Sequence, residues 1–254
     1  MQLRVLGCYG GETPDHRTSS FLVDDSLLLD AGSACSGLPL EDQLKIKHIL
    51  LTHTHMDHIR SIPFLLDNVL GKVSHKITIW GIPEVLELLH DNLFNNMIWP
   101  DFTKIPTPEK ALLVLNPLTP GQETDVDGYK VTAIPVNHTV PTAGFIVDNG
   151  EMSLLYSGDT AETDEIWKAG NERANLKVVL AETSFPAEMA KFGDLTKHLT
   201  SENLPGELKK LNRPEVPVYI YHTKPAHNAT IKSELAAIEG YDIRIMADGE
   251  SYSF

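Results

Sequence analysis

One stretch decides the fold: His53-Thr54-His55-Met56-Asp57-His58. The apolar run before it, residues 46–51, is typical of a buried strand, and residues 59–66 are typical of the start of a helix. Side chains alternate along a strand, so His53 and His55 are expected on the same side. Asp57 and His58 then fall where strand gives way to helix, at the carboxyl edge of a sheet, where open α/β folds place their sites.

The donors in this stretch predict a metal centre. Three imidazoles and a carboxylate within six residues are ligands suited to zinc, iron or manganese. Their crowding favours two metal ions over one. A loop that is rich in histidine by chance is the alternative, and the strand-then-helix context disfavours it.

Composition and charge narrow the functions. The chain has 254 residues, enough for one large α/β domain, and a formal net charge of −14. Such a surface repels long nucleic acids, which proteins hold with basic patches, but it allows a small anionic substrate beside metal ions. No apolar run approaches the ~20 residues that span a membrane, and the N-terminus shows no signal-peptide pattern. We therefore expect a cytoplasmic protein that does not engage membranes.

The order of elements predicts two packed sheets with helices outside. Helices are expected at 59–66, 84–93, 163–169, 201–211 and 230–238. Strands are expected at 3–6, 20–24, 27–30, 46–51, 76–80, 112–115, 129–136, 144–148, 153–156, 177–182, 218–221 and, closing the chain, 243–246. Because no linker or repeat interrupts this order, residues 1–254 are predicted to form one domain.

Three more metal-competent residues follow apolar strands. His138 comes after the predicted strand at 129–136. Asp159 comes after the predicted strand at 153–156, and His222 comes after the predicted strand at 218–221. One such residue alone would more often be an ordinary cap or a satisfied histidine. Three at strand ends, together with the first cluster, predict a single binuclear site on one rim of the sheets.

This pattern resembles the seven ligands of the metallo-β-lactamase superfamily, in its binuclear hydrolase branch. The resemblance implies an α/β fold, the αββα four-layer sandwich of two mixed β-sheets flanked by helices. It also implies two divalent metal ions, expected to be Zn²⁺, with Mn²⁺ or iron as alternatives. By position, Asp159 would bridge the two ions, one held by His53, His55 and His138 and the other by Asp57, His58 and His222.

Such a centre supplies a nucleophile. Two metal ions lower the pKa of a bridging water and give a hydroxide at neutral pH, which Asp57 is expected to orient. Two departures exclude other branches of the superfamily. His55 stands where oxygen-reducing flavodiiron members carry glutamate, and Asp159 stands where the best-known β-lactamases carry cysteine.

A second residue pair is similar to one in the phosphodiesterase members of the superfamily, including tRNase Z. It consists of Glu182, in Ala181-Glu182-Thr183-Ser184-Phe185, and His198, in Lys197-His198-Leu199-Thr200. The resemblance implies that His198 protonates the leaving oxygen and pairs with Glu182. The alternative reads Glu182 as a polar strand end and His198 as a residue at the entry of a helix.

The surroundings of these motifs resemble class II 3′,5′-cyclic nucleotide phosphodiesterases. The matching segments are His53 to Ile62, the insertion with Asn95 and Trp99-Pro100, Glu182 to Pro186 and His222 to Pro225. Pro63 and Phe64 depart from the pattern, because they stand where that family carries small aliphatic residues. The expected function is metal-dependent hydrolysis of a small-molecule cyclic nucleotide, cAMP or cGMP, to the 5′-nucleotide. Relatives of this kind are often homodimers, which leaves the oligomeric state open.

Other readings stay open. The same ligands serve a tRNase Z-like or cyclic-dinucleotide phosphodiesterase, a thioester or lactone hydrolase, or a metal-binding sensor without turnover. The segment 92–102 carries Phe94, Trp99 and Phe102 among amides. It is either a wall on which a base stacks or an insertion that packs its own aromatic rings onto the domain. Lys224 is either a partner of the substrate phosphate or a surface lysine.

Overall fold

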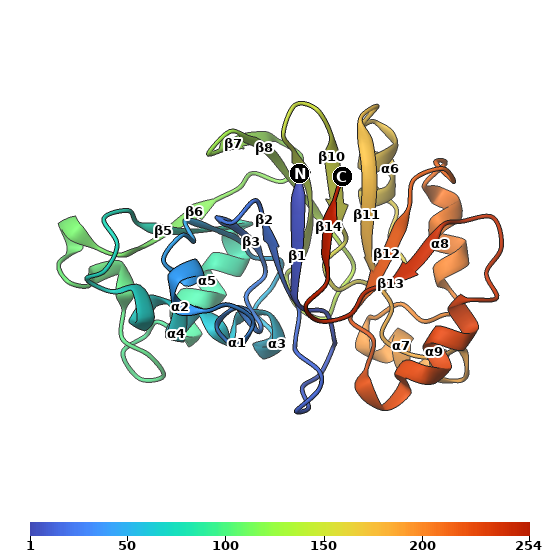
Figure 1. The fold of residues 1–254 in the computed structure, drawn as a ribbon, viewed down its shortest axis with the longest axis horizontal. Coiled ribbons are helices and arrows are strands. Elements are labelled where there is room, and N and C mark those ends of the chain that lie inside the picture. The colour runs from blue at the N-terminus through green and yellow to red at the C-terminus, as the bar shows by residue number, and fades with distance from the viewer.

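The computed structural model describes residues 1–254 and has two mixed β-sheets of seven strands each. The sheets stand next to each other in the middle of the molecule, and helices cover their outer faces (Figure 1). This is the αββα sandwich expected from the sequence, so the predicted fold is confirmed. The extent of the domain, 1–254, stays a prediction.

The first sheet has the strand order β14-β1-β2-β3-β4-β5-β6. It is antiparallel from β14 to β3 and parallel from β3 to β6. Its helices are α1 (Ala34–Gly37), α2 (Leu40–Gln43), α3 (Met56–Ile59), α4 (Ser61–Val69) and α5 (Pro83–Asn92). Its strands are β1 (Gln2–Gly7), β2 (Ser20–Val23), β3 (Leu27–Leu29), β4 (His48–Leu50), β5 (Ile77–Gly81), β6 (Leu113–Pro117) and β14 (Ser251–Ser253).

The second sheet has the order β13-β12-β11-β10-β9-β8-β7. It is antiparallel from β7 to β10 and parallel from β10 to β13. Its helices are α6 (Glu165–Asn171), α7 (Ala190–Thr196), α8 (Leu204–Lys210) and α9 (Asn228–Leu235). Its strands are β7 (Glu123–Val126), β8 (Tyr129–Pro135), β9 (Ala143–Asp148), β10 (Ser153–Tyr156), β11 (Leu176–Glu182), β12 (Val218–Tyr221) and β13 (Ile243–Ile245). Short 3₁₀ helices cover Phe102–Lys104, Pro108–Lys110, Ala187–Met189 and Pro225–His227.

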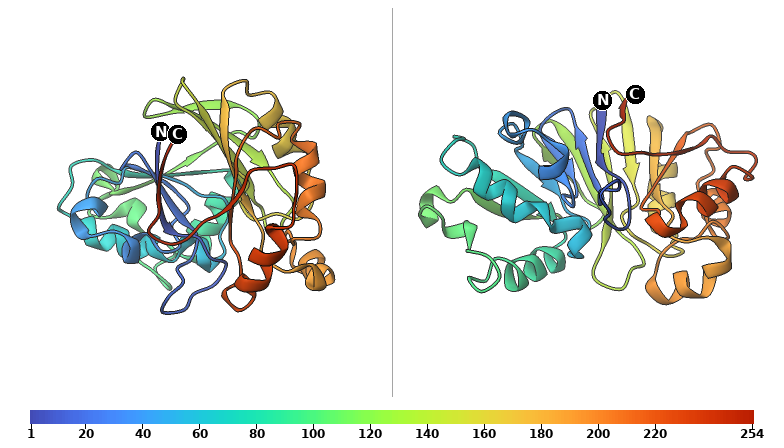
Figure 2. Two further views of the ribbon diagram at one scale, coloured as in Figure 1. Left: turned by 45° about the vertical axis from the view of Figure 1, so that its right-hand side comes forward. Right: turned by 60° about the horizontal axis from the view of Figure 1, so that its bottom comes forward.

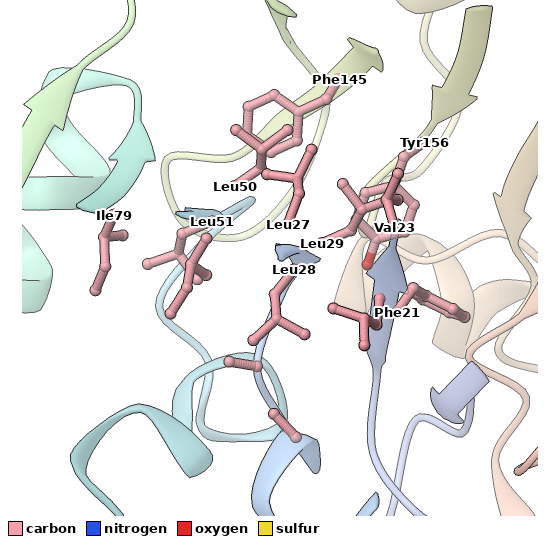
Figure 3. Close-up of a cluster of buried hydrophobic side chains, with 14 of the residues drawn as sticks. Phe21, Val23, Leu27, Leu28, Leu29, Leu50, Leu51, Ile79, Phe145 and Tyr156 are labelled. Carbon is pink, nitrogen blue, oxygen red and sulfur yellow. The ribbon is translucent and has the colours of Figure 1, made fainter. Parts of the chain in front are cut away.

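The main core joins the two sheets. Leu27 and Leu50 of the first sheet lie against Phe145 of the second, and Leu28 points to the opposite side, toward the helices (Figure 3). All four side chains are buried, and each full burial contributes about 1.5–3 kcal/mol. A smaller cluster on the outer face of the second sheet gathers residues of α6, α8 and α9, with Trp167 fully buried among them. These clusters hold the sheets rigidly, so the loops at the strand ends are held in place as well.

Several expectations about the elements are wrong. β7, α7 and β14 were not predicted, and the chain closes with β14 rather than with 243–246. β14 has the polar sequence Ser-Tyr-Ser and exists because it pairs with β1 across nearly the whole chain. Of the two readings of 92–102, the stacking wall does not hold for two rings, because Phe94 and Phe102 are buried in the main core. The alternative holds: the segment packs its aromatic rings onto the domain.

None of the helices is long and apolar enough to cross a membrane. Figure 1 shows α3 and α7 at the same, lower end of the two sheets, together with the loop that joins β1 to β2. Figure 2 turns this end toward the viewer in its right-hand panel. The loops that follow β4, β8, β10 and β12 carry the residues of the candidate site.

Candidate metal centre

The folded chain brings the seven candidate ligands together. β4 ends at Leu50, and the extended residues that follow it carry His53 and His55 up to the start of α3. Asp57 and His58 lie in the single turn of α3. The loops after β8, β10 and β12 bring in the other three ligands, His138, Asp159 and His222.

Asp159 lies at the centre of this cluster. Its Oδ2 is 3.2 Å from His58 Nε2, 3.2 Å from His222 Nε2 and 3.7 Å from His53 Nε2. The carboxylate is 1% exposed, so water does not screen it from these rings. A bridging ligand has to reach both halves of a binuclear site, and Asp159 is placed to do so.

The remaining ligands form the two groups expected from the sequence. The ligand atoms of His53, His55 and His138 lie within 4.8 Å of one another, and His55 Nδ1 is 3.2 Å from His138 Nε2. The second group consists of Asp57, His58 and His222, whose ligand atoms also lie within 4.8 Å of one another. In this group Asp57 Oδ2 is 3.2 Å from His222 Nε2. Metal ligation by these residues stays a prediction.

Unpartnered buried atoms show that the cluster fits a metal. His53 Nε2, His58 Nε2 and Asp159 Oδ1 are buried and have no hydrogen-bond partner. Leaving a buried polar atom unpaired costs about 1–3 kcal/mol, so folded proteins rarely tolerate three beside one another. A divalent cation would satisfy all of them, and these nitrogen and oxygen donors suit zinc, manganese or iron.

Asp30 supports the cluster from behind. This fully buried carboxylate, directly after β3, accepts hydrogen bonds from Thr52 N and Oγ1 at 2.8 Å each, and from His58 Nδ1 and Tyr156 OH at 2.7 Å each. Because Thr52 Oγ1 donates to Asp30, it accepts from His53 Nδ1 at 2.9 Å. Both rings therefore carry their proton on Nδ1 and turn an Nε2 lone pair into the site, as ligation requires.

Sequence reasoning missed Asp30, which it read as the end of a hairpin strand. A signal was present, because Asp30 follows an apolar strand, as Asp159 does. The hydrogen bonds that distinguish a supporting residue from a ligand are not visible in the sequence.

Two further histidines are held in the same way. His138 Nδ1 donates to Lys197 O at 2.9 Å. His222 Nδ1 lies 2.8 Å from Ser184 Oγ, whose hydroxyl donates to Glu182 Oε2 at 3.0 Å. Each ring has its outer nitrogen engaged, so each turns Nε2 toward the other ligands.

Burial and charge set the protonation states. Burial lowers the pKa of His53, His55, His138 and His222, so these rings are neutral at pH 7. Burial would also lower the pKa of His58, but the carboxylates of Asp159 and Asp30 outweigh it and raise that pKa. The strong field of two buried carboxylates at His58 is what a cation at this position would compensate.

Glu182 and His198 form the predicted pair beside the cluster. His198 Nδ1 donates to Glu182 Oε1 at 2.8 Å, and Thr160 N donates to the same oxygen at 3.1 Å. Burial lowers the pKa of His198, but the Glu182 carboxylate outweighs it and raises that pKa above its usual value. His198 lies after α7, not at the entry of a helix. His198 also forms a close trio with His138 and Asp159 and another with Glu182 and His222, so its ring is close enough to these residues to be a metal ligand.

The loop between β1 and β2 presses on one ligand. His222 has a φ of 67°, its N–H donates to Cys8 O at 2.6 Å, and a Cβ at Gly10 would lie 2.7 Å from its ring Nδ1. Only glycine therefore fits at this position. Lys224 ties the loop down, because its Nζ donates to Gly10 O at 2.5 Å. Lys224 is therefore not simply a surface lysine, since its ammonium group already has a structural partner in Gly10 O. Whether it also contacts a substrate phosphate stays a prediction.

Gly10→Ala is expected to weaken metal binding roughly 10- to 100-fold, because the added methyl group displaces the His222 ring. Titration of the metal-free protein with Zn²⁺ measures this change. The matched control is Gly11→Ala, whose Cβ would meet its nearest neighbour, Pro225 Cδ, at 3.3 Å. Equal affinities in the two variants would contradict the expected displacement.

Residues 26–216 match the family model described as the beta-lactamase superfamily domain. The chain therefore belongs to the metallo-β-lactamase superfamily. It is thus a hydrolase of the metallo-β-lactamase fold, a fold that implies divalent metal binding. Among curated relatives, it is 25% identical to the probable 3′,5′-cyclic-nucleotide phosphodiesterase of Yersinia pestis, over 98% of this chain and 88% of the relative. It is 30% identical to 3′,5′-cyclic-nucleotide phosphodiesterase 1 of Saccharomyces cerevisiae, over 64% of this chain and 50% of the relative.

Solved structures agree on the fold. Unliganded yeast PDE1 superimposes with a TM-score of 0.85 at 22% identity and 98% coverage of both chains. The metallo-beta-lactamase fold protein YhfI from Bacillus subtilis gives 0.77 at 21% identity, covering 99% of this chain and 98% of that one. The resemblance to this superfamily and to its cyclic-nucleotide phosphodiesterases, inferred from the sequence, is therefore confirmed.

Proposed function

We propose that the protein hydrolyses 3′,5′-cyclic nucleotides to 5′-nucleotides in a site with two divalent metal ions. One observation carries this proposal: the His198–Glu182 pair, with a proton on His198 Nδ1, lies at the edge of the seven-ligand cluster. The names of the Yersinia and yeast relatives support the choice of substrate. A site for simple metal binding has no need of this second pair.

The seven donors divide by position. His53, His55 and His138 would hold one ion, Asp159 would lie between the two ions, and Asp57, His58 and His222 would hold the other. Divalent ions at these positions would supply Lewis acidity to the phosphate oxygens and lower the pKa of water. Zinc is the metal we propose, and manganese or iron suits the same donors.

His198 acts on the leaving group. As water adds to phosphorus, the P–O3′ bond breaks and O3′ needs a proton, which His198 donates from its second ring nitrogen, Nε2. Glu182 holds the ring by Nδ1 and favours the protonated form, which raises the fraction of the proton donor present at neutral pH. The ring then takes a proton from solvent, and the product is a 5′-nucleotide.

Asp57 acts on the water. One of its oxygens, Oδ2, lies 3.2 Å from His222 Nε2, and the side chain keeps 26% of its surface exposed. Burial would raise the pKa of Asp57, but the neighbouring rings of His222 and His58 outweigh it and lower that pKa. A permanently ionised carboxylate here orients the attacking water and accepts its hydrogen bond.

The rest of the chain suits a small substrate. The net charge of −14 opposes the binding of long nucleic acids. Cys8 and Cys35 are both free thiols, which suits the reducing cytoplasm where we place the protein.

A substrate panel tests the proposal. The purified protein, loaded with Zn²⁺ or Mn²⁺, is given cAMP, cGMP, a cyclic dinucleotide, bis-p-nitrophenyl phosphate and a thioester. We expect turnover of a 3′,5′-cyclic nucleotide that is lost on chelation and returns with metal. Turnover of only the dinucleotide or the generic diester would retain the phosphodiesterase chemistry and reject the substrate. Turnover of only the thioester would reject both the phosphodiesterase chemistry and the substrate. No turnover of any compound, with metal bound, would favour a metal-binding sensor without catalytic activity.

A further inference from the structure

An exposed aromatic ring lies close to His198. Phe192, on α7, keeps 45% of its surface exposed, and Leu195, one turn later on the same helix, keeps 73%. Residues three apart share one face of a helix. We call this pair the α7 face. Large apolar side chains that remain this exposed beside a catalytic pair are candidates for substrate contact.

Phe185 connects the α7 face to the site. Its ring centroid lies 5.2 Å from that of Phe192, nearly perpendicular at 83°, and 5.9 Å from that of His198. The ammonium group of Lys224 lies 5.9 Å above the same ring. An unbroken row of rings therefore leads from the proton donor to the surface, with a positive charge alongside it.

The row is rigidly held. Ser184 N donates to Leu199 O at 2.9 Å, and Ser201 N donates to Phe185 O at 3.1 Å, so the segments around Phe185 and His198 run as a short ladder. α7 packs tightly on that ladder at Gly193, where a Cβ would lie 2.6 Å from Thr200 Cγ2. The distance between the α7 face and His198 is thus set by backbone contacts.

We propose that Phe192 is a specificity-determining residue that stacks against the base of the nucleotide substrate, an inference that rests on the proposed function. In a 3′,5′-cyclic nucleotide the ribose carries both the leaving O3′ and the base. With O3′ at His198, a base directed along the row of rings would meet the α7 face. Every base has a π-face, so an exposed ring binds any of them by stacking.

A second exposed ring provides a matched comparison. Phe64 lies on α4, keeps 51% of its surface exposed and contacts Trp99 edge-on, with centroids 5.4 Å apart. Its exposure and its aromatic neighbour resemble those of Phe192, but it belongs to the opposite half of the molecule. Figure 1 shows α4 and α7 on either side of β1.

The kinetic experiment compares Phe192→Ala and Phe64→Ala on two substrates, cAMP and ribose 3′,5′-cyclic phosphate, which lacks the base. For Phe192→Ala we expect KM for cAMP to rise roughly ten-fold, since stacking on one ring contributes about that much, with no change for the substrate without a base. Phe64→Ala should match the wild type on both. An unchanged KM in Phe192→Ala, or a base-dependent rise only in Phe64→Ala, would overturn the proposal.

An equilibrium measurement separates this proposal from the proposed function. In Phe192→Trp, read as the difference from the wild type, 5′-AMP should quench the fluorescence of the new indole and ribose 5-phosphate should not. No quenching by 5′-AMP, or equal quenching by both, would overturn the role of Phe192. If the wild type turns over no cyclic nucleotide, the proposed function fails, and the fluorescence result still decides whether a base binds here.

Discussion

We expect Asp159→Asn to lose one metal equivalent per chain and to lower turnover roughly a thousand-fold or more, because the bridging carboxylate that we propose would serve both ions, and each ion would contribute several kcal/mol to the stabilisation of the transition state. The amide has almost the same shape but no charge. It would also place an N–H₂ group among His53, His58 and His222, whose Nε2 atoms lie 3.2–3.7 Å from Asp159 Oδ2. Elemental analysis after gel filtration counts the metal, and cyclic-nucleotide hydrolysis measures the activity.

The control for this change is Asp67→Asn, an exposed carboxylate on α4. It should keep the full metal content and activity. A melting curve of metal-free Asp159→Asn should show a cooperative transition, which excludes unfolding as the cause of metal loss. Two metal equivalents retained by Asp159→Asn would contradict the bridging assignment.

His198→Ala keeps both metal ions and lowers kcat for cAMP by roughly 10²–10⁴-fold, which is the usual contribution of a positioned proton donor. The reason is that the ribose O3′ leaves poorly as an alkoxide. A p-nitrophenyl diester provides the contrast, since p-nitrophenolate leaves without a proton and should lose little rate in the same variant. Loss of a metal ion in His198→Ala would indicate that His198 is a metal ligand instead of a proton donor. It lies close enough to His138 and Asp159, and to Glu182 and His222, to be one.

The partner variant, Glu182→Gln, tests the same role through pH. The donor has to be protonated, so kcat falls as pH rises through the pKa of His198. Burial lowers that pKa, and in the wild type Glu182 outweighs burial; with the neutral amide only the more distant charge of Asp159 still opposes burial, so the pKa of His198 falls. The alkaline fall should therefore begin at lower pH in Glu182→Gln. An unchanged alkaline limb would show that His198 is not the group that titrates.

The fold and the ligand set could be predicted because both depend on local patterns. Apolar strands of four to seven residues are visible in the sequence, and each of His138, Asp159 and His222 follows one within three residues. Since strand ends converge on one edge, chain order was enough to group these residues with the HTHMDH stretch. The roles of the ligands stay predictions until metal is measured.

The parts that could not be predicted depend on long-range contacts. β14 has no apolar pattern, and its pairing with β1 joins Leu3 to Tyr252. Asp30 looks like a turn residue until Tyr156, from the other sheet, is seen to donate to it. The row from Phe192 to His198 depends on how α7 packs, and that helix is seven residues long with a glycine inside, which weakens its local signal.

The attachment of the last strand has a consequence for synthesis on the ribosome. Asp248 accepts hydrogen bonds from Cys8 N at 3.0 Å and Arg17 N at 2.8 Å, and so fastens both ends of the loop that presses on His222. The first of these contacts spans 240 residues, which take on the order of 12–48 seconds to translate. Until then the outer edge of β1 is unpaired and open to other nascent chains. The proposed metal centre can therefore mature only after Asp248 has left the exit tunnel.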